Sequence, residues 1–514
     1  MGALFSSDKP DNPPNSGASI RISTGNPGFD AILLGGLPGD RIYLLEGSPG
    51  SGKTTLALQF LLEGVARGER GLYIALSETR EELLGVAASH GWSLEGIDVF
   101  ELASAEEVLG QGREQSVLHS WELELGGTIK LIQDQAEQVK PSRVVFDSLS
   151  ELRLLAGDAL RYRRQILALK QFFAGRNTTV LLVDDLTTFA NGEHDTLLHS
   201  LCHGVISLER VTLDFGSVRR RLQIQKLRGA TFLGGYHDFL IRKGGLDVFP
   251  RLIAAAHRVA EVGEPTPSGV AELDALFNGG PLGGTTTLLT GPPGAGKTSI
   301  VLQYVDAACR RGERCAVFQF DERVGTLLLR AKSFGLDLQG HIDNGLLLIQ
   351  QVDPAELSPG EFAWRLQKEV ENSRCRLIVI DSLSGYLASM PEEQHLVLQL
   401  HELLSYLNEK GVATFMTIPH QGFIGPTQAE LNISYIADIV VAVRFFEAHG
   451  RIRKAISVVK NRAGAHEDMI RELRIDFRGV RVGAPLKDFT GVLTGAPRYV
   501  GANAPLMEDR RSEL

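Results

Sequence analysis

The stretch Gly47-Ser48-Pro49-Gly50-Ser51-Gly52-Lys53-Thr54 decides the fold, and it recurs as Gly291-Pro292-Pro293-Gly294-Ala295-Gly296-Lys297-Thr298. Both stretches read G-x-x-x-x-G-K-T, the P-loop whose backbone N–H groups surround nucleotide phosphates. Each is preceded by an apolar run and followed by a helical pattern. This strand–loop–helix context distinguishes a working P-loop from a chance match. The sequence therefore predicts two nucleotide-binding sites.

The repeat extends well beyond the two loops. The positions of Lys53 and Lys297 differ by 244, as do those of Gly25 and Gly269, whereas later landmarks differ by 234. The smaller offset predicts a longer loop in the first copy, near residues 104–127. Within each copy, apolar strands alternate with helical stretches, and the repeat is far too long for a solenoid. We predict an α/β fold with two tandem domains, each a mostly parallel twisted sheet with helices on both faces and a C-terminal β-hairpin.

Each P-loop is paired with an acid farther along the chain. Asp147 and Asp381 each close a run of four apolar residues, at the end of a strand where a doubly wound sheet binds ligands. An acid there can hold Mg²⁺ together with the P-loop hydroxyls of Thr54 and Thr298, while the P-loop lysines reach the β- and γ-phosphates. A strand end followed by a polar turn is the alternative for the acids. The predicted ATP-binding residues of the loops are Ser48, Gly50, Ser51, Gly52, Lys53, Thr54, Thr55, Pro292, Gly294, Ala295, Gly296, Lys297, Thr298 and Ser299.

Phosphoryl transfer to water also needs a group that orients or activates the nucleophile. Glu78, Asp321 and Glu322 follow the next strand pattern after each P-loop, and we predict them as catalytic acids. Solvated acids at strand ends are the alternative interpretation. The cluster at 219–221, Arg-Arg-Arg, occurs only in the first copy and is expected at the surface.

Cations recur in the two terminal hairpins as Lys-Leu-Arg and Lys-Asn-Arg. They could stabilise phosphate charge in the site of a neighbouring subunit, since such cations act in trans in many ATPases. A solvated hairpin face is the alternative, and the recurrence favours the functional interpretation. The predicted trans contacts in the hairpins are Lys226, Leu227, Arg228, Lys460 and Arg462.

Composition excludes several classes of protein. A net charge of −9 opposes a general attraction to nucleic acid. The four cysteines have no C-x-x-C spacing, which predicts free thiols in a reducing compartment rather than a disulfide framework or a zinc site. No apolar run approaches the length of a membrane span, and the first residues are too rich in proline for a signal peptide. We expect a cytoplasmic protein without membrane contact.

Domain boundaries follow from the repeat and from proline and glycine. We predict a disordered segment at 1–19, a first domain at 20–250 and a linker at 251–265. The second domain is expected at 266–484, followed by an extended tail at 485–514. The full 514 residues are too many for a single core.

Together these landmarks resemble the KaiC family of tandem RecA-like ATPases, from about Ile20 to Arg481. The resemblance rests on the two P-loops, the S-G-V-A-E-L-D segment at 268–274, the two D-S-L-S strands and the K-x-R hairpins. It implies ATP bound at the subunit interfaces of a homohexameric double ring. It also implies ATP hydrolysis in the first ring and serine/threonine autophosphorylation in the second.

The resemblance implies further site residues. Ser89 and Phe334 are expected near the nucleotide, Phe334 by stacking on adenine, and His466 is expected to contact it from the neighbouring subunit. The clock members of the family present adjacent serine and threonine phosphoacceptors. The aligned residues of this chain are Ser434 and Tyr435, so Ser434 is the predicted acceptor.

Where the family carries a pair of glutamates, this chain has Ser77-Glu78 in the first copy and Asp321-Glu322 in the second. We expect an ATPase and autokinase that acts as a signalling or timing hub with regulatory protein partners. One alternative is a RecA-like nucleic-acid-dependent ATPase, which the acidic charge balance opposes. Another is a nucleotide-gated scaffold with an inactive first ring, which Ser77 favours.

Overall fold

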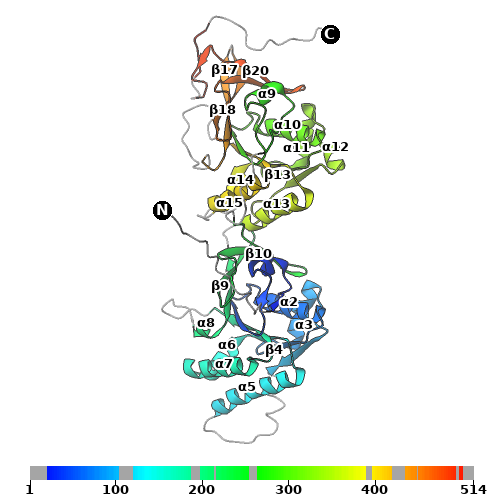
Figure 1. Cartoon of the computed structure of the whole chain (residues 1–514), viewed down its shortest axis with the longest axis vertical. Helices are drawn as coiled ribbons and strands as arrows, with labels where there is room; N and C mark the ends of the chain where they lie inside the picture. The colour runs from blue at the N-terminus through cyan, green and yellow to red at the C-terminus, as the bar shows by residue number, and fades with distance from the viewer. Residues whose placement is uncertain are drawn as a thin grey trace, which may run out of the picture. The chain divides into compact units, whose positions relative to one another are not determined.

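The computed structural model describes residues 20–102, 120–186, 197–212, 216–253, 263–388, 396–419, 435–448, 450–493 and 497–501. The chain divides into two compact units at Arg251 and Leu252, and each contains its own nine-stranded sheet with helices (Figure 1). The expected disordered segment at 1–19, most of the expected linker and most of the expected longer loop lie outside the described residues.

The first unit is a mostly parallel sheet in the strand order β11-β10-β9-β8-β3-β7-β6-β4-β5. Neighbours from β5 to β8 are parallel, and β9, β10 and β11 continue the sheet in antiparallel fashion. Its strands are β3 (Ile42–Gly47), β4 (Gly71–Ala75), β5 (Ile97–Glu101), β6 (Arg143–Asp147), β7 (Thr179–Asp185), β8 (Gly204–Val211), β9 (Arg219–Leu227), β10 (Tyr236–Arg242) and β11 (Gly245–Phe249), with β1 (Arg21–Ile22) and β2 (Leu37–Pro38) paired separately. Its helices are α1 (Pro27–Ile32), α2 (Lys53–Ala66), α3 (Arg80–His90), α5 (Ser120–Val139), α6 (Leu149–Ala156), α7 (Ala159–Phe173) and α8 (Leu197–Leu201).

The second unit repeats this topology as β20-β19-β18-β17-β12-β16-β15-β13-β14. Its strands are β12 (Thr286–Gly291), β13 (Cys315–Gln319), β14 (Leu347–Gln351), β15 (Leu377–Asp381), β16 (Ala413–Pro419), β17 (Ile439–Ala448), β18 (Arg451–Asn461), β19 (Arg471–Asp476) and β20 (Gly479–Pro485), with β21 (Phe489–Thr490) and β22 (Arg498–Tyr499) paired separately. Its helices are α9 (Ala271–Ala275), α10 (Lys297–Arg310), α11 (Val324–Ser333), α12 (Leu338–Asp343), α13 (Pro359–Ser373), α14 (Leu383–Ala388) and α15 (Leu396–Glu409).

Two hydrophobic clusters explain why the central strands of the first unit are largely apolar. In the first unit, alternate residues of β3 contribute to different clusters, Tyr43 and Leu45 to one and Leu44 to the other. Helix α2 packs into the first cluster through Leu56, and α7 packs into the second through Ile166. A strand covered by helices on both faces has no solvated side, so its sequence does not alternate. The duplicated α/β fold with helices on both faces is confirmed.

The antiparallel end of each sheet is larger than predicted. The expected hairpins are present as β8–β9 and β17–β18, but each is followed by a second antiparallel pair, β10–β11 and β19–β20. These later strands mix charged and apolar residues, as in Y-H-D-F-L-I-R of β10 and R-E-L-R-I-D of β19, so they lack the continuous apolar runs that predicted the central strands. Within the segment expected as an extended tail, β21 pairs with β22 and Val492 is buried.

A carboxylate closes the turn that leads into each P-loop strand. Asp30 accepts hydrogen bonds from the Ser23 hydroxyl at 2.7 Å and from the Thr24 amide at 2.8 Å. In the second unit, Asp274 accepts from the Ser268 amide at 2.7 Å. The amide of the matching residues Thr24 and Ser268 thus bonds the same carboxylate in both units, which gives a local structural reason for the aspartate that recurs before each loop.

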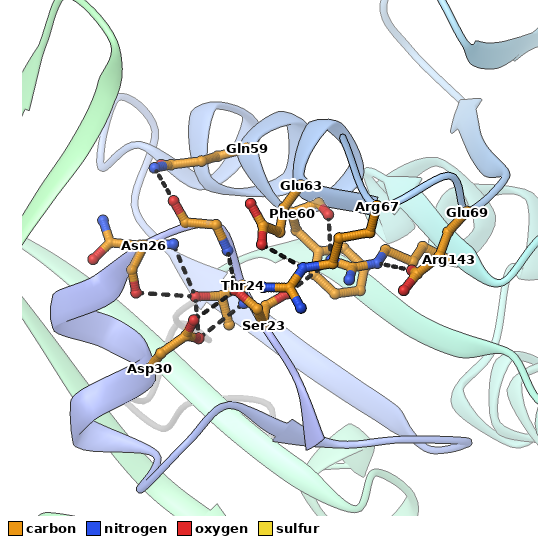
Figure 2. Close-up of polar contacts among 11 residues, drawn as sticks. Ser23, Thr24, Asn26, Asp30, Gln59, Phe60, Glu63, Arg67, Glu69 and Arg143 are labelled. Atoms are coloured by element: carbon orange, nitrogen blue, oxygen red, sulfur yellow. Dashed lines mark hydrogen bonds and ion pairs between the residues drawn. The ribbon is translucent and has the colours of Figure 1, made fainter. Parts of the chain in front are cut away.

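A buried arginine ties this turn to the P-loop helix in the first unit only (Figure 2). Arg143, 1% exposed, donates through Nη1 to the carbonyl oxygens of Ser23 and Phe60, both at 2.7 Å. Its Nε donates to Glu69 at 2.5 Å, and its guanidinium lies 4.8 Å from the centre of the Phe60 ring. Gly71 pairs with Arg143, whereas the matching Cys315 pairs with Leu377, so the second unit has an apolar residue at this place.

Candidate functional site

The first P-loop connects β3 to α2 with the geometry that its glycines require. Gly50 and Gly52 have φ angles of 73° and 105°, a region that residues with a Cβ rarely adopt. Lys53 is the first residue of α2, and its Nζ donates to the carbonyls of Gly47 at 2.9 Å and Ser48 at 3.1 Å. The lysine ammonium therefore lies over the loop, where the helix N-terminus also favours an anion.

The predicted magnesium ligands of the first unit lie together. The Thr54 hydroxyl donates to Asp147 Oδ2 at 2.8 Å, and the Tyr73 hydroxyl donates to the same oxygen at 2.6 Å. Burial raises the pKa of Asp147, and hydrogen bonds from Tyr73 and Thr54 and the charge of Lys53 oppose that rise. A hydroxyl and a carboxylate oxygen beside a phosphate-binding loop fit Mg²⁺, which keeps phosphate oxygens and waters as its other ligands.

The second unit has the same contact. The Thr298 hydroxyl donates to Asp381 Oδ2 at 2.8 Å, and the Thr417 hydroxyl donates to the other oxygen of that carboxylate. Lys297 donates to the carbonyls of Gly291 at 2.7 Å and Pro292 at 3.0 Å. Burial lowers the pKa of Lys297 to about 8, although Asp381 opposes this shift. Nowhere in the described part of the chain do three or more His, Cys, Asp or Glu side chains gather in a way that could hold a metal ion.

The three predicted catalytic acids have different surroundings. Burial raises the pKa of Glu78 to about 7, with Asp147 adding to the rise, and its Oε2 has no hydrogen-bond partner among the described residues. A carboxylate that titrates near neutrality is suited to a general base. Asp321 is exposed, and its charge acts on the pKa of Lys297. Glu322 instead forms an ion pair with Arg330 at 2.7 Å.

The structure does not bring the hairpin cations to the P-loop of their own unit. Lys226 pairs with Val205 at the level of Leu44, three residues, or about 10 Å, before Gly47. Its Nζ donates to carbonyls at the end of α8, including that of Cys202 at 2.9 Å. The remaining members behave similarly: Arg228 Nη2 donates to Ser200 O at 3.2 Å, Lys460 Nζ to Ala437 O at 2.6 Å and Arg462 Nη1 to Tyr435 O at 2.9 Å, while Leu227 is buried.

The surroundings of the residues implied by the family resemblance say little about contact with a nucleotide. Ser89 is exposed on α3 and donates to the Val86 carbonyl at 2.7 Å. Phe334 is 6% exposed within a hydrophobic cluster, so in this arrangement its ring offers little surface to a base. His466 is half-buried, and Ser434 lies outside the described residues.

Two kinds of residue beside the P-loops, an acid and an arginine, were not predicted from the sequence. Asp185, at the end of β7, forms an ion pair with Lys53 at 2.9 Å. Arg210 lies so near the loop that a Cβ on Gly50 would be 3.2 Å from its Nη1. Its counterpart 234 positions later, Arg444, contributes to the lowered pKa of Lys297. The recurrence of arginine at that offset was the available signal.

One expectation for this region was wrong. The arginine cluster at 219–221 was expected at the surface, but Arg219 is 3% exposed at the start of β9. The antiparallel register places Arg220 opposite Arg210, at the same end of the sheet as the P-loop. The expectation is therefore wrong for Arg219, which is buried, whereas Arg220 and Arg221 are half-buried and strand pairing places Arg220 at the end of the sheet that carries the loop.

Comparisons with known proteins agree with this geometry. A family model described as "ATPase: KaiC" matches twice, at residues 22–253 and 266–487. Circadian clock protein KaiC3 of a Synechocystis species is 28% identical over 489 residues, which cover 93% of this chain and 95% of that protein. Circadian clock oscillator protein KaiC of Synechococcus elongatus is 27% identical over 519 residues, covering 98% and 96%. Among the described residues, no helix has the length and apolar character needed to cross a membrane.

Proposed function

Because this chain belongs to the KaiC family of ATPases, we propose that it is a Mg²⁺-dependent, homohexameric ATPase whose second domain phosphorylates the chain itself. One observation carries the proposal. In both units the P-loop threonine donates to the strand-end aspartate at 2.8 Å, through Thr54 to Asp147 and through Thr298 to Asp381. Each unit thus holds a phosphate-binding lysine and a pair of hard oxygen ligands at one place.

The hairpin cations support sites that are shared between copies of the chain. Lys226 and Lys460 lie about 10 Å before the P-loop along its neighbouring strands, so neither serves the phosphate site of its own unit. Both side chains are held by carbonyls, which keeps the ammonium groups at one edge of the domain. In a closed ring, such an edge can face the P-loop of the next subunit.

For hydrolysis in the first domain, we assign the base to Glu78. Its raised pKa, near 7, allows the carboxylate to take a proton from water close to neutral pH. Lys53 stabilises negative charge on the phosphate tail. Bound Mg²⁺ would supply further neutralisation of that charge at Thr54 and Asp147. The half-buried base with a raised pKa favours an active first ring over the alternative of an inactive scaffold.

For phosphoryl transfer in the second domain, we assign Asp321 as the acid and Ser434 as the acceptor. Asp321 is exposed, and it lies close enough to Lys297 for its negative charge to raise the pKa of that lysine. A group that acts beside the γ-phosphate is expected to lie this near to the P-loop lysine. Arg462 donates to the carbonyl of Tyr435, which directly follows Ser434 in sequence. Since relatives are named as clock proteins, we propose that the phosphorylation and nucleotide state is read by regulatory protein partners in the cytoplasm.

A mixing experiment with full-length chains tests the shared sites. All chains carry Lys297→Ala so that only the first site turns over, and Lys53→Ala chains are mixed with Lys226→Ala chains. Each variant alone should be inactive. The mixture should recover about one quarter of the activity, because random assortment in a ring rebuilds that share of intact interfaces. A mixture that stays inactive would contradict sites formed in trans.

A control variant completes the mixing test. Lys170 also donates to a carbonyl at the end of α8, that of Leu201 at 2.6 Å, but it belongs to α7. Lys170→Ala should therefore leave turnover close to the wild-type value, unless the loss in Lys226→Ala comes only from a weakened α8.

For the kinase, incubation with Mg²⁺ and ATP followed by peptide mass spectrometry should place phosphate on Ser434. A chain that releases ADP but stays unmodified there is an ATPase without this kinase activity.

A further inference from the structure

In the first unit, an acidic side chain forms an ion pair with the P-loop lysine. Asp185 Oδ1 lies 2.9 Å from Lys53 Nζ, and the lysine side chain is only 8% exposed whereas the aspartate is 38% exposed. The pairing follows from strand order, since β7 lies beside β3 and places Asp185 directly opposite Gly47. The preceding acid, Asp184, is turned to other partners, Arg153 and the Ser150 hydroxyl. Of the two acids at this strand end, Asp185 is therefore the one that contacts a P-loop residue.

The second unit lacks this acid. Its register is identical at the matching place, where Gly291 pairs with Pro419. Proline has no side-chain charge, so it cannot pair with Lys297. Lys297 keeps its hydrogen bonds to the loop carbonyls, and its pKa is lowered to about 8 because burial outweighs the attraction of nearby acids. The two sites thus share their phosphate-binding parts and differ in the acids near the lysine: the first has Asp185 where the second has Pro419, and the second has Asp321 where the first has Ser77. Among the described residues, Asp185 forms an ion pair with its P-loop lysine, whereas Asp321 acts on Lys297 through its charge.

The consequence depends on how many phosphates the ligand carries. A P-loop lysine binds the β- and γ-phosphates, so a triphosphate places extra negative charge where the Asp185 carboxylate already lies. A diphosphate ends one group earlier and meets less of that repulsion. Like charges a few ångströms apart in a partly buried site interact by several times the value in water.

We propose that Asp185 sets the nucleotide preference of the first site, by competing with the γ-phosphate for Lys53 and so favouring ADP over ATP relative to the second site. The inference rests on the proposed function, since it needs both P-loops to bind adenine nucleotides. It assigns to one side chain a difference in nucleotide preference between two domains whose loops share one motif. A first domain poised toward ADP would release the product of hydrolysis slowly.

The test measures two affinities at a single site of the full-length chain. In a Lys297→Ala background, calorimetry with Mg²⁺ gives the dissociation constants of ADP and of the non-hydrolysable triphosphate adenylyl imidodiphosphate. Asp185→Asn should shift the ratio of these constants by about tenfold toward the triphosphate. The matched control is Asp98→Asn, which removes the same charge from exposed β5 at the far edge of the sheet and should leave the ratio unchanged.

The reciprocal change tests the second site. In a Lys53→Ala background, Pro419→Asp should move the ratio toward ADP. If the unmodified sites bind neither nucleotide, the proposed function itself fails. If they bind both and Asp185→Asn leaves the ratio unaltered or weakens the two nucleotides equally, Asp185 only orients the lysine and the inference is overturned.

Discussion

Replacing Arg143 with leucine should selectively loosen the first domain around its P-loop helix. The side chain is 1% exposed and makes three hydrogen bonds, to the carbonyls of Ser23 and Phe60 and to the carboxylate of Glu69. Hydrogen bonds to a charged group contribute about 1.5–3 kcal/mol each. Leucine relieves the desolvation of a buried guanidinium, which returns part of that energy. We therefore expect a net loss of about 2–4 kcal/mol, and leucine is the residue that the second unit carries at this place.

Hydrogen exchange followed by mass spectrometry measures this loss in the full-length chain. Amides of α2 and of the turn at Ser23 and Thr24 should exchange about 30- to 1,000-fold faster in Arg143→Leu, since each 1.4 kcal/mol is a factor of ten. Amides of α10 in the second unit are the internal reference. The matched variant is Arg67→Leu, which breaks an exposed ion pair with Glu63 in the same region and should change little (Figure 2). Equal effects of the two substitutions would refute the argument that the buried contacts of Arg143 stabilise the domain more than an exposed ion pair does.

Three further outcomes follow from the site. The kcat/KM of the first site should rise with pH through about 7 and level off above it, because the base acts as a carboxylate; Glu78→Gln should remove that rise, and a profile unchanged by it would exclude Glu78 as the base. Gly52→Ala should weaken ATP binding at the first site by tenfold or more, because φ of Gly52 is 105° and the new Cβ would lie 2.8 Å from the Ile241 side chain. The control is Gly68→Ala, at a glycine with φ of 78° and open surroundings, and it should leave ATP affinity unchanged. In titrations of the second site with ATP, Thr298→Val should raise the Mg²⁺ concentration needed for half-maximal binding by about tenfold.

Much of the fold was accessible from the sequence because its signals are local. The P-loop is a continuous stretch, and the glycines that let its backbone turn stand next to the lysine that they position. The runs that become β3 (I-Y-L-L-E-G) and β12 (T-T-L-L-T-G) are equally local, since a strand covered on both faces consists largely of apolar and β-branched residues that fit buried positions. Duplication made each signal visible twice. The second antiparallel pair of each unit was missed because its strands mix charged and apolar residues and so lack a continuous apolar run.

The sequence by itself determined that this protein has two α/β domains with P-loops, a threonine and a distant aspartate for each, and membership of the KaiC family. Tertiary structure alone decided which further distant residues meet at those loops. Asp185 reaches Lys53 across 132 positions because β7 is inserted beside β3, and Lys226 is kept away from the loop because β9 runs antiparallel to β8. Strand order and direction arise from packing of the whole domain, so no local pattern of residues encodes them. The chemistry that distinguishes the two sites therefore depends on sheet topology, although the sites share one motif.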